Sequence, residues 1–167
     1  FWSEIVKIET ATNGADVSVY SSELIEPTAE IVFSAGGEKF LFDARSFFQG
    51  NRFLVEDLIR LAIENASGKI AFDLFCGVGL FTLPLARKFE KVIGVEASAR
   101  AIELAGKNAE NARIGNIEFF AAGTAEFLND EELPAEQIDF VLLDPPRAGA
   151  AAETVDALLN LKPVQIS

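Results

Sequence analysis

Hydrophobic and polar positions divide this chain into a strand-like N-terminal part and a longer part in which strands and helices alternate. Up to residue 46, apolar and polar residues alternate in short runs, and turns such as Thr-Asn-Gly and Ala-Gly-Gly-Glu separate the runs. This pattern predicts strands in hairpins. The expected strands are 4–10, 15–21, 30–34 and 39–43. We interpret residues 1–46 as a β-rich remnant of a preceding domain.

From residue 51 the pattern changes to alternating helices and buried strands. The expected helices are 51–66, 80–89, 98–112, a short helix opening 124–137, and 151–161. The expected strands are 69–75, 91–98, 116–122, 138–146 and 163–167. Such alternation predicts an α/β fold, with a doubly wound parallel sheet covered by helices on both faces. Residues 47–167 are therefore taken as one incomplete domain, cut off just after the fifth strand begins.

Three local signals refine these helices. In the helix over 51–66, Phe53, Leu54, Leu58, Leu61 and Ala62 lie at helical spacing. Pro84 is compatible with the helix over 80–89 only in its first turn. Ser98 is a suitable N-cap for the helix over 98–112.

Composition narrows the function classes. The net charge of −12 argues against a broad basic surface for nucleic acid, and the absence of His excludes His-based catalysis and His metal sites. The single cysteine excludes an internal disulfide, and no apolar run approaches the ~20 residues of a membrane span. We expect no metal, no membrane partner and a cytoplasmic setting. The chain also lacks Met and opens on Phe1 and Trp2, so we expect a piece of a longer protein.

Candidate site residues follow the predicted strands, where parallel sheets bind their ligands. Gly77 and Gly79 lie between a strand and a helix, and Glu96 ends the next strand. A glycine loop followed by such an acid is typical of nucleoside binding, since a carboxylate can accept hydrogen bonds from both ribose hydroxyls. The alternatives are a tight strand–helix turn and a solvated acid. The nicotinamide fingerprint fails because position 82 is Thr.

A second cluster follows the strand over 138–146. Asp144, Pro145, Pro146 and Arg147 come directly after an apolar run. The prolines remove two backbone donors, and an arginine beside them can contact phosphate or a base edge. We therefore expect a substrate-side loop here.

Together these motifs resemble a known family. "FDLFCGVGLFTLPLA", "VIGVEAS", "NAENARIGNIEFF", "FVLLDPPRAGA" and the preceding "SFFQGN" are similar to segments of the RNA uracil-5 methyltransferases. These belong to the class I S-adenosylmethionine-dependent methyltransferases. The resemblance covers about residues 44–167 and implies a Rossmann-like methyltransferase sheet, S-adenosylmethionine as cofactor and RNA as partner of the full-length protein.

The resemblance also implies roles for individual residues. The cofactor-binding positions would be Gln49, Phe75, Gly77, Gly79, Leu80, Glu96 and Asp144. Glu96 would hold the ribose, and Asp144 would lie near the methionine moiety and the target base. Many methyltransferases place an acid or amide near the adenine after the third strand. Here that position could be filled by Thr124, Glu126 or backbone amides.

Cys76 is the one candidate nucleophile that the chain itself contains. In the family, a cysteine thiolate adds to C6 of uracil and so activates C5, but that cysteine follows the fifth strand. Cys76 lies in the cofactor loop instead, and a free cysteine is commonly a small buried apolar residue. No catalytic residue is therefore assigned within the chain, and the nucleophile is expected beyond Ser167.

The expected function is methylation of uridine C5 in RNA, with 23S ribosomal RNA favoured over transfer RNA and no DNA substrate. Two alternatives stay open: another class I RNA methyltransferase, or a non-catalytic module that binds S-adenosylmethionine or RNA. N-methylating enzymes are disfavoured because Arg147 replaces their aromatic residue after the two prolines.

Overall fold

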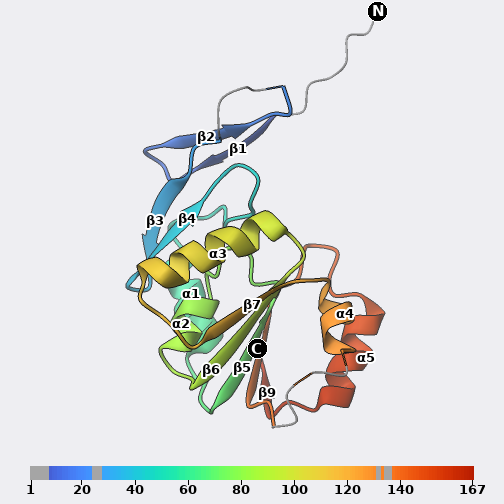
Figure 1. Ribbon diagram of the computed structural model, residues 1–167. Helices are drawn as coiled ribbons and strands as arrows, with labels where there is room; N and C mark the ends of the chain where they lie inside the picture. Colours follow the sequence, from blue (N-terminus) through green and yellow to red (C-terminus); the bar gives the residue numbers. More distant parts are fainter. Residues whose placement is uncertain (1–7, 24–27, 131–132, 134–136) are drawn as a thin grey trace, which may run out of the picture.

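The computed structural model describes residues 8–23, 28–130, 133 and 137–167. Its centre is a parallel five-stranded sheet with the order β7-β6-β5-β8-β9 (Figure 1). The strands are β5 (Ile70–Leu74), β6 (Lys91–Glu96), β7 (Ile117–Ala121), β8 (Phe140–Leu143) and β9 (Gln165–Ile166). The predicted parallel α/β sheet is thus confirmed. All five residues of β5 are buried, as expected for a central strand covered on both faces.

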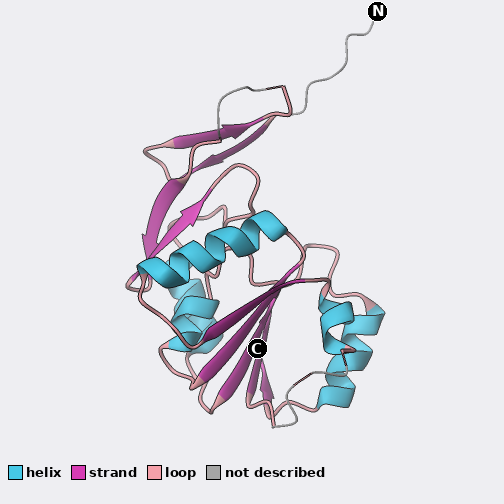
Figure 2. Cartoon of the chain, viewed as in Figure 1, coloured by secondary structure: helices cyan, strands magenta, loops and turns pink. Residues whose placement is uncertain are grey.

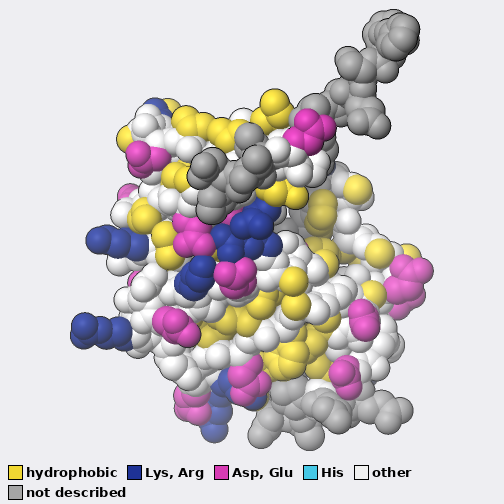
Figure 3. All heavy atoms as spheres, turned by 45° about the horizontal axis from the view of Figure 1, so that its top comes forward, with side chains coloured by type: hydrophobic (Ala, Val, Ile, Leu, Met, Phe, Trp, Pro, Cys, Tyr) yellow, Lys and Arg dark blue, Asp and Glu magenta, His cyan; other side chains and the backbone are white. Residues whose placement is uncertain are grey.

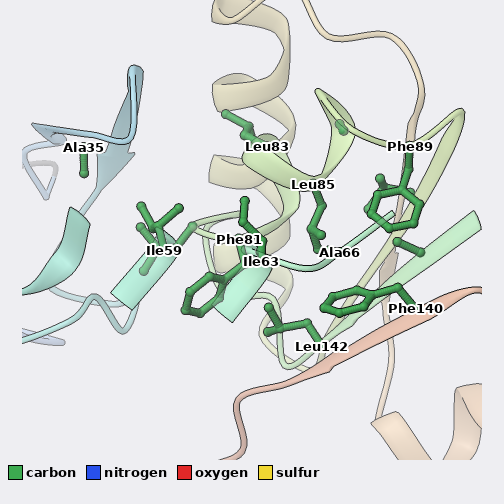
Figure 4. Close-up of a cluster of buried hydrophobic side chains, with 14 of the residues drawn as sticks. Ala35, Ile59, Ile63, Ala66, Phe81, Leu83, Leu85, Phe89, Phe140 and Leu142 are labelled. Atoms are coloured by element: carbon green, nitrogen blue, oxygen red, sulfur yellow. The ribbon is translucent and has the colours of Figure 1, made fainter. Parts of the chain in front are cut away.

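Helices cover both faces of this sheet (Figure 2). The helices are α1 (Val55–Ile63), α2 (Thr82–Ala86), α3 (Ala99–Asn111), α4 (Thr124–Leu128) and α5 (Ala152–Leu161). In Figure 1, α1 to α3 lie on one face and α4 and α5 on the other. Each face has its own core: Leu83 and Phe140 belong to one (Figure 4), and Phe127 and Leu158 to the other.

Two of the local predictions for the helices are confirmed. Ser98 caps α3, because its side-chain oxygen accepts a hydrogen bond from the amide of Ala101. Pro84 is the third residue of the short helix α2 and so lies in its first turn, where a missing N–H is tolerated.

Helix α1 differs from the sequence-based expectation in both its start and its buried face. It begins at Val55 rather than Asn51, because Asn51 forms a turn in which its side-chain oxygen accepts from the amide of Phe53. The buried residues are Val55, Ile59 and Ile63. The stripe singled out above lies mostly on the other side: the exposed fractions are Phe53 79%, Leu54 54%, Leu58 40% and Leu61 61%.

Two antiparallel hairpins precede the sheet. The strands are β1 (Glu9–Thr12), β2 (Val17–Tyr20), β3 (Ile31–Ala35) and β4 (Glu38–Phe42), paired β1 with β2 and β3 with β4. Part of the strand expected over 4–10 and part of the acidic loop in 124–137 lie outside the described residues. Ile31 and Phe42 share a core with Val78 and Leu104, so hairpin β3–β4 packs against α3 and the loop after β5. A domain boundary near residue 46 stays a prediction.

Within the described ranges, no helix has the length and apolar character needed to cross a membrane.

Candidate binding site at the carboxyl ends of the central strands

The loop that follows β5 is shaped by three residues in the left-handed region. Phe75, Gly77 and Gly79 have φ angles of 68°, 54° and 91°. A Cβ atom on Gly79 would lie 2.8 Å from Leu83 Cδ1, so glycine allows α2 to pack closely on the loop. A Cβ atom on Gly77 would meet nothing nearer than 3.9 Å, so the space beside Gly77 is open. Phe75 adopts this region although it is not glycine, and such strained residues cluster at functional sites.

The Glu96 side chain forms hydrogen bonds to the segments that follow β5 and β6. One carboxylate oxygen accepts from the amide of Gly77 at 3.3 Å, and the other accepts from the amide of Ser98 at 2.8 Å. A carboxylate has about four acceptor positions, so two remain for a ligand. The structure therefore places the predicted ribose-binding acid directly beside the glycine loop.

Asp144 and Gln49 meet although 95 positions separate them in the sequence. The Gln49 side-chain amide donates to the Asp144 carboxylate at 3.0 Å. Partial desolvation raises the pKa of Asp144, and the bond from Gln49 acts in the opposite direction. The pair joins the segment before α1 to the end of β8, beside the loop after β5.

Phe48 holds Gln49 in this position. The Phe48 ring stacks on Phe42 with the centroids 4.4 Å apart, and it also contacts Phe33 and Phe40. Its neighbour Phe47 points outward, with 75% of its surface exposed. The "SFFQGN" segment is thus fixed to hairpin β3–β4 by one phenylalanine and presents the other to solvent.

Five predicted cofactor residues line one small cavity of about 30 Å³. They are Gln49, Phe75, Gly77, Leu80 and Asp144. Glu96 and Gly79 do not line this cavity. A cavity of this size would enclose only a small part of a nucleoside cofactor, so most of such a ligand would lie outside it.

The loop that is predicted to face the substrate begins after Asp144, which lines this cavity. The amide of Gly149 donates to the carbonyl of Pro146, which closes a turn after β8. Arg147 is exposed and forms no ion pair with any residue that the structure describes. Of the two candidates for the adenine side, Thr124 is buried and Glu126 is exposed at the start of α4.

Asp73 received no role in the sequence analysis. It is fully buried in β5, where one oxygen accepts from the Thr82 hydroxyl and the other has no partner among the described atoms. Burial, with the nearby charges of Asp144 and Glu96, raises its pKa to about 7. An acid inside an otherwise apolar strand was the signal available in the sequence.

Cys76 has the surroundings of a structural residue. It is 3% exposed, and its sulfur lies in the space left by Gly94, where a Cβ atom would come within 3.2 Å of Sγ. Burial and the charges of Asp73 and Glu96 raise the pKa of the thiol well above its usual value. A thiol in such a place stays protonated and is a poor nucleophile.

Comparison with known proteins gives three concordant results. A family model described as tRNA (uracil-5-)-methyltransferase matches residues 29–164. The 23S rRNA (uracil(1939)-C(5))-methyltransferase RlmD of Haemophilus influenzae is 38% identical over 133 residues, which is 78% of this chain and 30% of that protein. The protein of the same name from Pseudomonas aeruginosa is 39% identical over 131 residues, 75% of this chain and 29% of its own length.

Among solved structures, the tRNA (uracil-54, C5)-methyltransferase of Pyrococcus abyssi in complex with S-adenosyl-L-homocysteine superposes with a TM-score of 0.70. It is 33% identical, and the match covers 82% of this chain and 33% of that one. The chain thus spans about a third of the length of these relatives.

Proposed function

Because the chain belongs to the tRNA (uracil-5-)-methyltransferase family, we propose that the whole protein transfers a methyl group from S-adenosylmethionine to C5 of a uridine in RNA. The observation that carries this proposal is that Gly77, Glu96 and Asp144 lie at or just after the ends of the adjacent strands β5, β6 and β8, with Gln49 bonded to Asp144 and Gly77 bonded to Glu96. Ribosomal RNA is the favoured substrate class, since relatives named for 23S rRNA are 38% and 39% identical, against 33% for the tRNA enzyme of known structure.

The residues present fit the cofactor. The free acceptor positions of Glu96 suit the ribose hydroxyls, and the open space beside Gly77 allows the nucleoside to approach the backbone. The Gln49–Asp144 pair would hold the amino-acid end of the cofactor, with one Asp144 oxygen engaged by Gln49 and the other available to an ammonium group. When bound, S-adenosylmethionine supplies an electrophilic methyl group.

Uracil C5 needs activation before it can accept a methyl group, and addition of a thiolate at C6 provides it. Cys76 is the only cysteine of the chain, and its burial and raised pKa make it unsuitable. We therefore propose that the nucleophile comes from a part of the whole protein outside residues 1–167.

Cofactor binding can be tested with calorimetry on this chain. We expect Glu96→Gln to weaken binding of S-adenosylhomocysteine by about 1.5 kcal/mol, the lower end of the range for a hydrogen bond to a charged group. Glu153→Gln is the matched control, because Glu153 is an exposed acid on α5. Equal affinities for all three proteins would remove Glu96 from the site.

The reaction itself requires the whole protein. We expect mass spectrometry to find 5-methyluridine in 23S ribosomal RNA after incubation with S-adenosylmethionine. Modification of transfer RNA alone would overturn the ribosomal assignment. Cofactor binding without modification of any RNA would favour the alternative of a non-catalytic binding module.

A further inference from the structure

A second, larger cavity lies on the other side of the segment 46–53. Its volume is about 700 Å³, within the ~300–1,000 Å³ typical of small-molecule sites. It lies between hairpin β1–β2, hairpin β3–β4 and the segment that precedes α1. Phe47, Phe48 and Gln49 line both this cavity and the small cavity at Asp144, so the two are separated by one stretch of backbone.

The described lining of the larger cavity is rich in aromatic residues and includes no acid. Five phenylalanines contribute to it: Phe33, Phe42, Phe47, Phe48 and Phe53. The remaining polar lining groups are Thr10, Thr12, Ser46, Gln49, Asn51 and Arg52. The chain contains 26 acidic residues and has a net charge of −12, so a wall whose described residues include one cation and no acid departs from the composition of the whole chain. On the face drawn in Figure 3, basic and acidic side chains adjoin one another without a continuous basic field.

Arg52 and Phe53 form an exposed part of this lining. The guanidinium of Arg52 lies over the Phe53 ring, with Cζ 4.8 Å from the centroid, and the ring itself is 79% exposed. At the tip of hairpin β1–β2, a Cβ atom on Gly14 would lie 1.4 Å from an Arg52 nitrogen. The hairpin tip thus lies against the guanidinium, which would have to move if residue 14 carried a side chain, and Arg52 forms no ion pair with any described residue.

These features together match one class of ligand. Exposed aromatic rings and guanidinium planes stack on unpaired bases of single-stranded RNA, and amide and hydroxyl groups bind the base edges. A wall without acids avoids repulsion of the phosphates on either side of such a base. An uncharged, planar base also suits a cavity in which Arg52 is the one charged residue of the described lining, since its charge is delocalised over the guanidinium.

We propose that this cavity binds one unpaired nucleobase of the substrate RNA, next in the strand to the uridine that is methylated. The inference rests on the proposed function. The base in this cavity is not the reacting uridine, because methyl transfer needs the reacting atoms about 3–3.5 Å apart, and residues 47–49 separate the cavity from Asp144. The two cavities thus hold neighbouring parts of one strand on the two sides of the "SFFQGN" segment.

The test uses the whole protein with S-adenosylhomocysteine and a ten-nucleotide single-stranded RNA that contains one uridine. In a series of probes, each probe lacks the base at one position, and the series covers all positions other than the uridine. For the wild type, we expect loss of the base at one position beside the uridine to weaken binding about tenfold, as for one base–aromatic stack. Phe53→Leu should weaken binding of the intact probe to the same extent, and loss of that base should then have no further effect.

Matched variants separate this site from general effects. Arg52→Ala should also weaken binding. Arg60→Ala should not, although it removes the same charge from an exposed position on α1. Phe120→Leu removes a partly exposed ring from β7 and serves as the aromatic control. Wild-type affinity of both Phe53→Leu and Arg52→Ala for all probes would overturn this site and leave the cofactor assignment intact. No binding of any probe by the wild type would overturn the proposed RNA substrate together with the site.

Discussion

Asp73 shows how strongly position can change the chemistry of one residue. It has no exposed surface, one of its oxygens lacks a partner among the described atoms, and its pKa is raised to about 7. In the unfolded chain an aspartate has a pKa of about 3.9. The folded state therefore binds the proton more tightly, and the free energy of unfolding falls as pH rises from about 4 to about 7.

Replacement of Asp73 by Asn should remove this pH dependence. At pH 8 we expect Asp73→Asn to be more stable than the wild type by a few kcal/mol, with about 4 kcal/mol as the upper limit from a shift of about three pKa units. At pH 4 the two proteins should be similar, since Asp73 is then protonated. Urea denaturation at several pH values measures this difference.

The control is Asp57→Asn, because the Asp57 side chain is 61% exposed and makes only a surface ion pair. A stability difference between wild type and Asp73→Asn that stays constant from pH 4 to pH 8 would contradict the assigned pKa.

At the scale of elements, α1 presents apolar residues on two sides and packs with one. Ile59 lies in the same core as Ala35, Leu85 and Phe140 (Figure 4), and it also approaches Gly36 in the turn of hairpin β3–β4. Leu61, two positions later, is 61% exposed. Helical spacing alone does not distinguish these two sides, because the apolar residues on each side recur every three to four positions.

Two alanine substitutions test which side of α1 is buried. Ile59→Ala should lower the free energy of unfolding by about 2–4 kcal/mol, the usual effect of truncating a core residue. Leu61→Ala should change it by less than about 0.5 kcal/mol, because its surroundings are mostly solvent. Urea denaturation at pH 7 distinguishes them, and equal losses would contradict the orientation of α1 described here.

At the scale of the molecule, an ion-pair network joins α3 to the N-terminal part. Arg100 contacts Glu30 at 2.7 Å, Asp43 at 2.8 Å and Glu103 at 2.7 Å, and the Asp43 side chain is fully buried. Burial alone would raise the pKa of Asp43, but hydrogen bonds from Arg100 and Arg45 hold it below its usual value. Asn108 of α3 adds two hydrogen bonds to the backbone of Leu41 in β4.

Loss of Arg100 should therefore destabilise the fold. We expect Arg100→Met to lower the free energy of unfolding at pH 7 by about 2 kcal/mol, less than the 3–5 kcal/mol typical of a broken buried pair, because Arg45 remains beside Asp43. A group with a depressed folded pKa stabilises above its unfolded pKa, and that contribution is lost as pH falls through the folded value. The difference between variant and wild type should thus shrink below pH 4.

Thermal or urea unfolding at pH 7 and pH 3 measures the effect of Arg100→Met. Arg60→Met is the control, because Arg60 forms only an exposed pair with Asp57 and should contribute little at either pH. An Arg100→Met protein as stable as the control at pH 7 would contradict the structural role of the network.

The order of elements and the place of the candidate site could be predicted from the sequence. Alternating periodicities specify strands and helices locally, and Ser98 and Pro84 mark helix starts by their own side-chain chemistry. Residues that follow parallel strands lie along the same edge of the sheet, where such sheets bind their ligands. Gly77, Glu96 and Asp144 could therefore be grouped before the structure was known, while their ligand contacts stay predictions.

Only the tertiary structure decided which residues meet across long separations. The Gln49–Asp144 pair, the burial of Ile59 instead of Leu61 and the raised pKa of Asp73 all depend on how the hairpins, helices and sheet are placed together. The cavity between hairpin β1–β2 and the segment 46–53 has no counterpart in any local pattern. The physical reason is that periodicity reports the neighbours of a residue within its own element, whereas burial, desolvation and side-chain pairing depend on the elements packed against it.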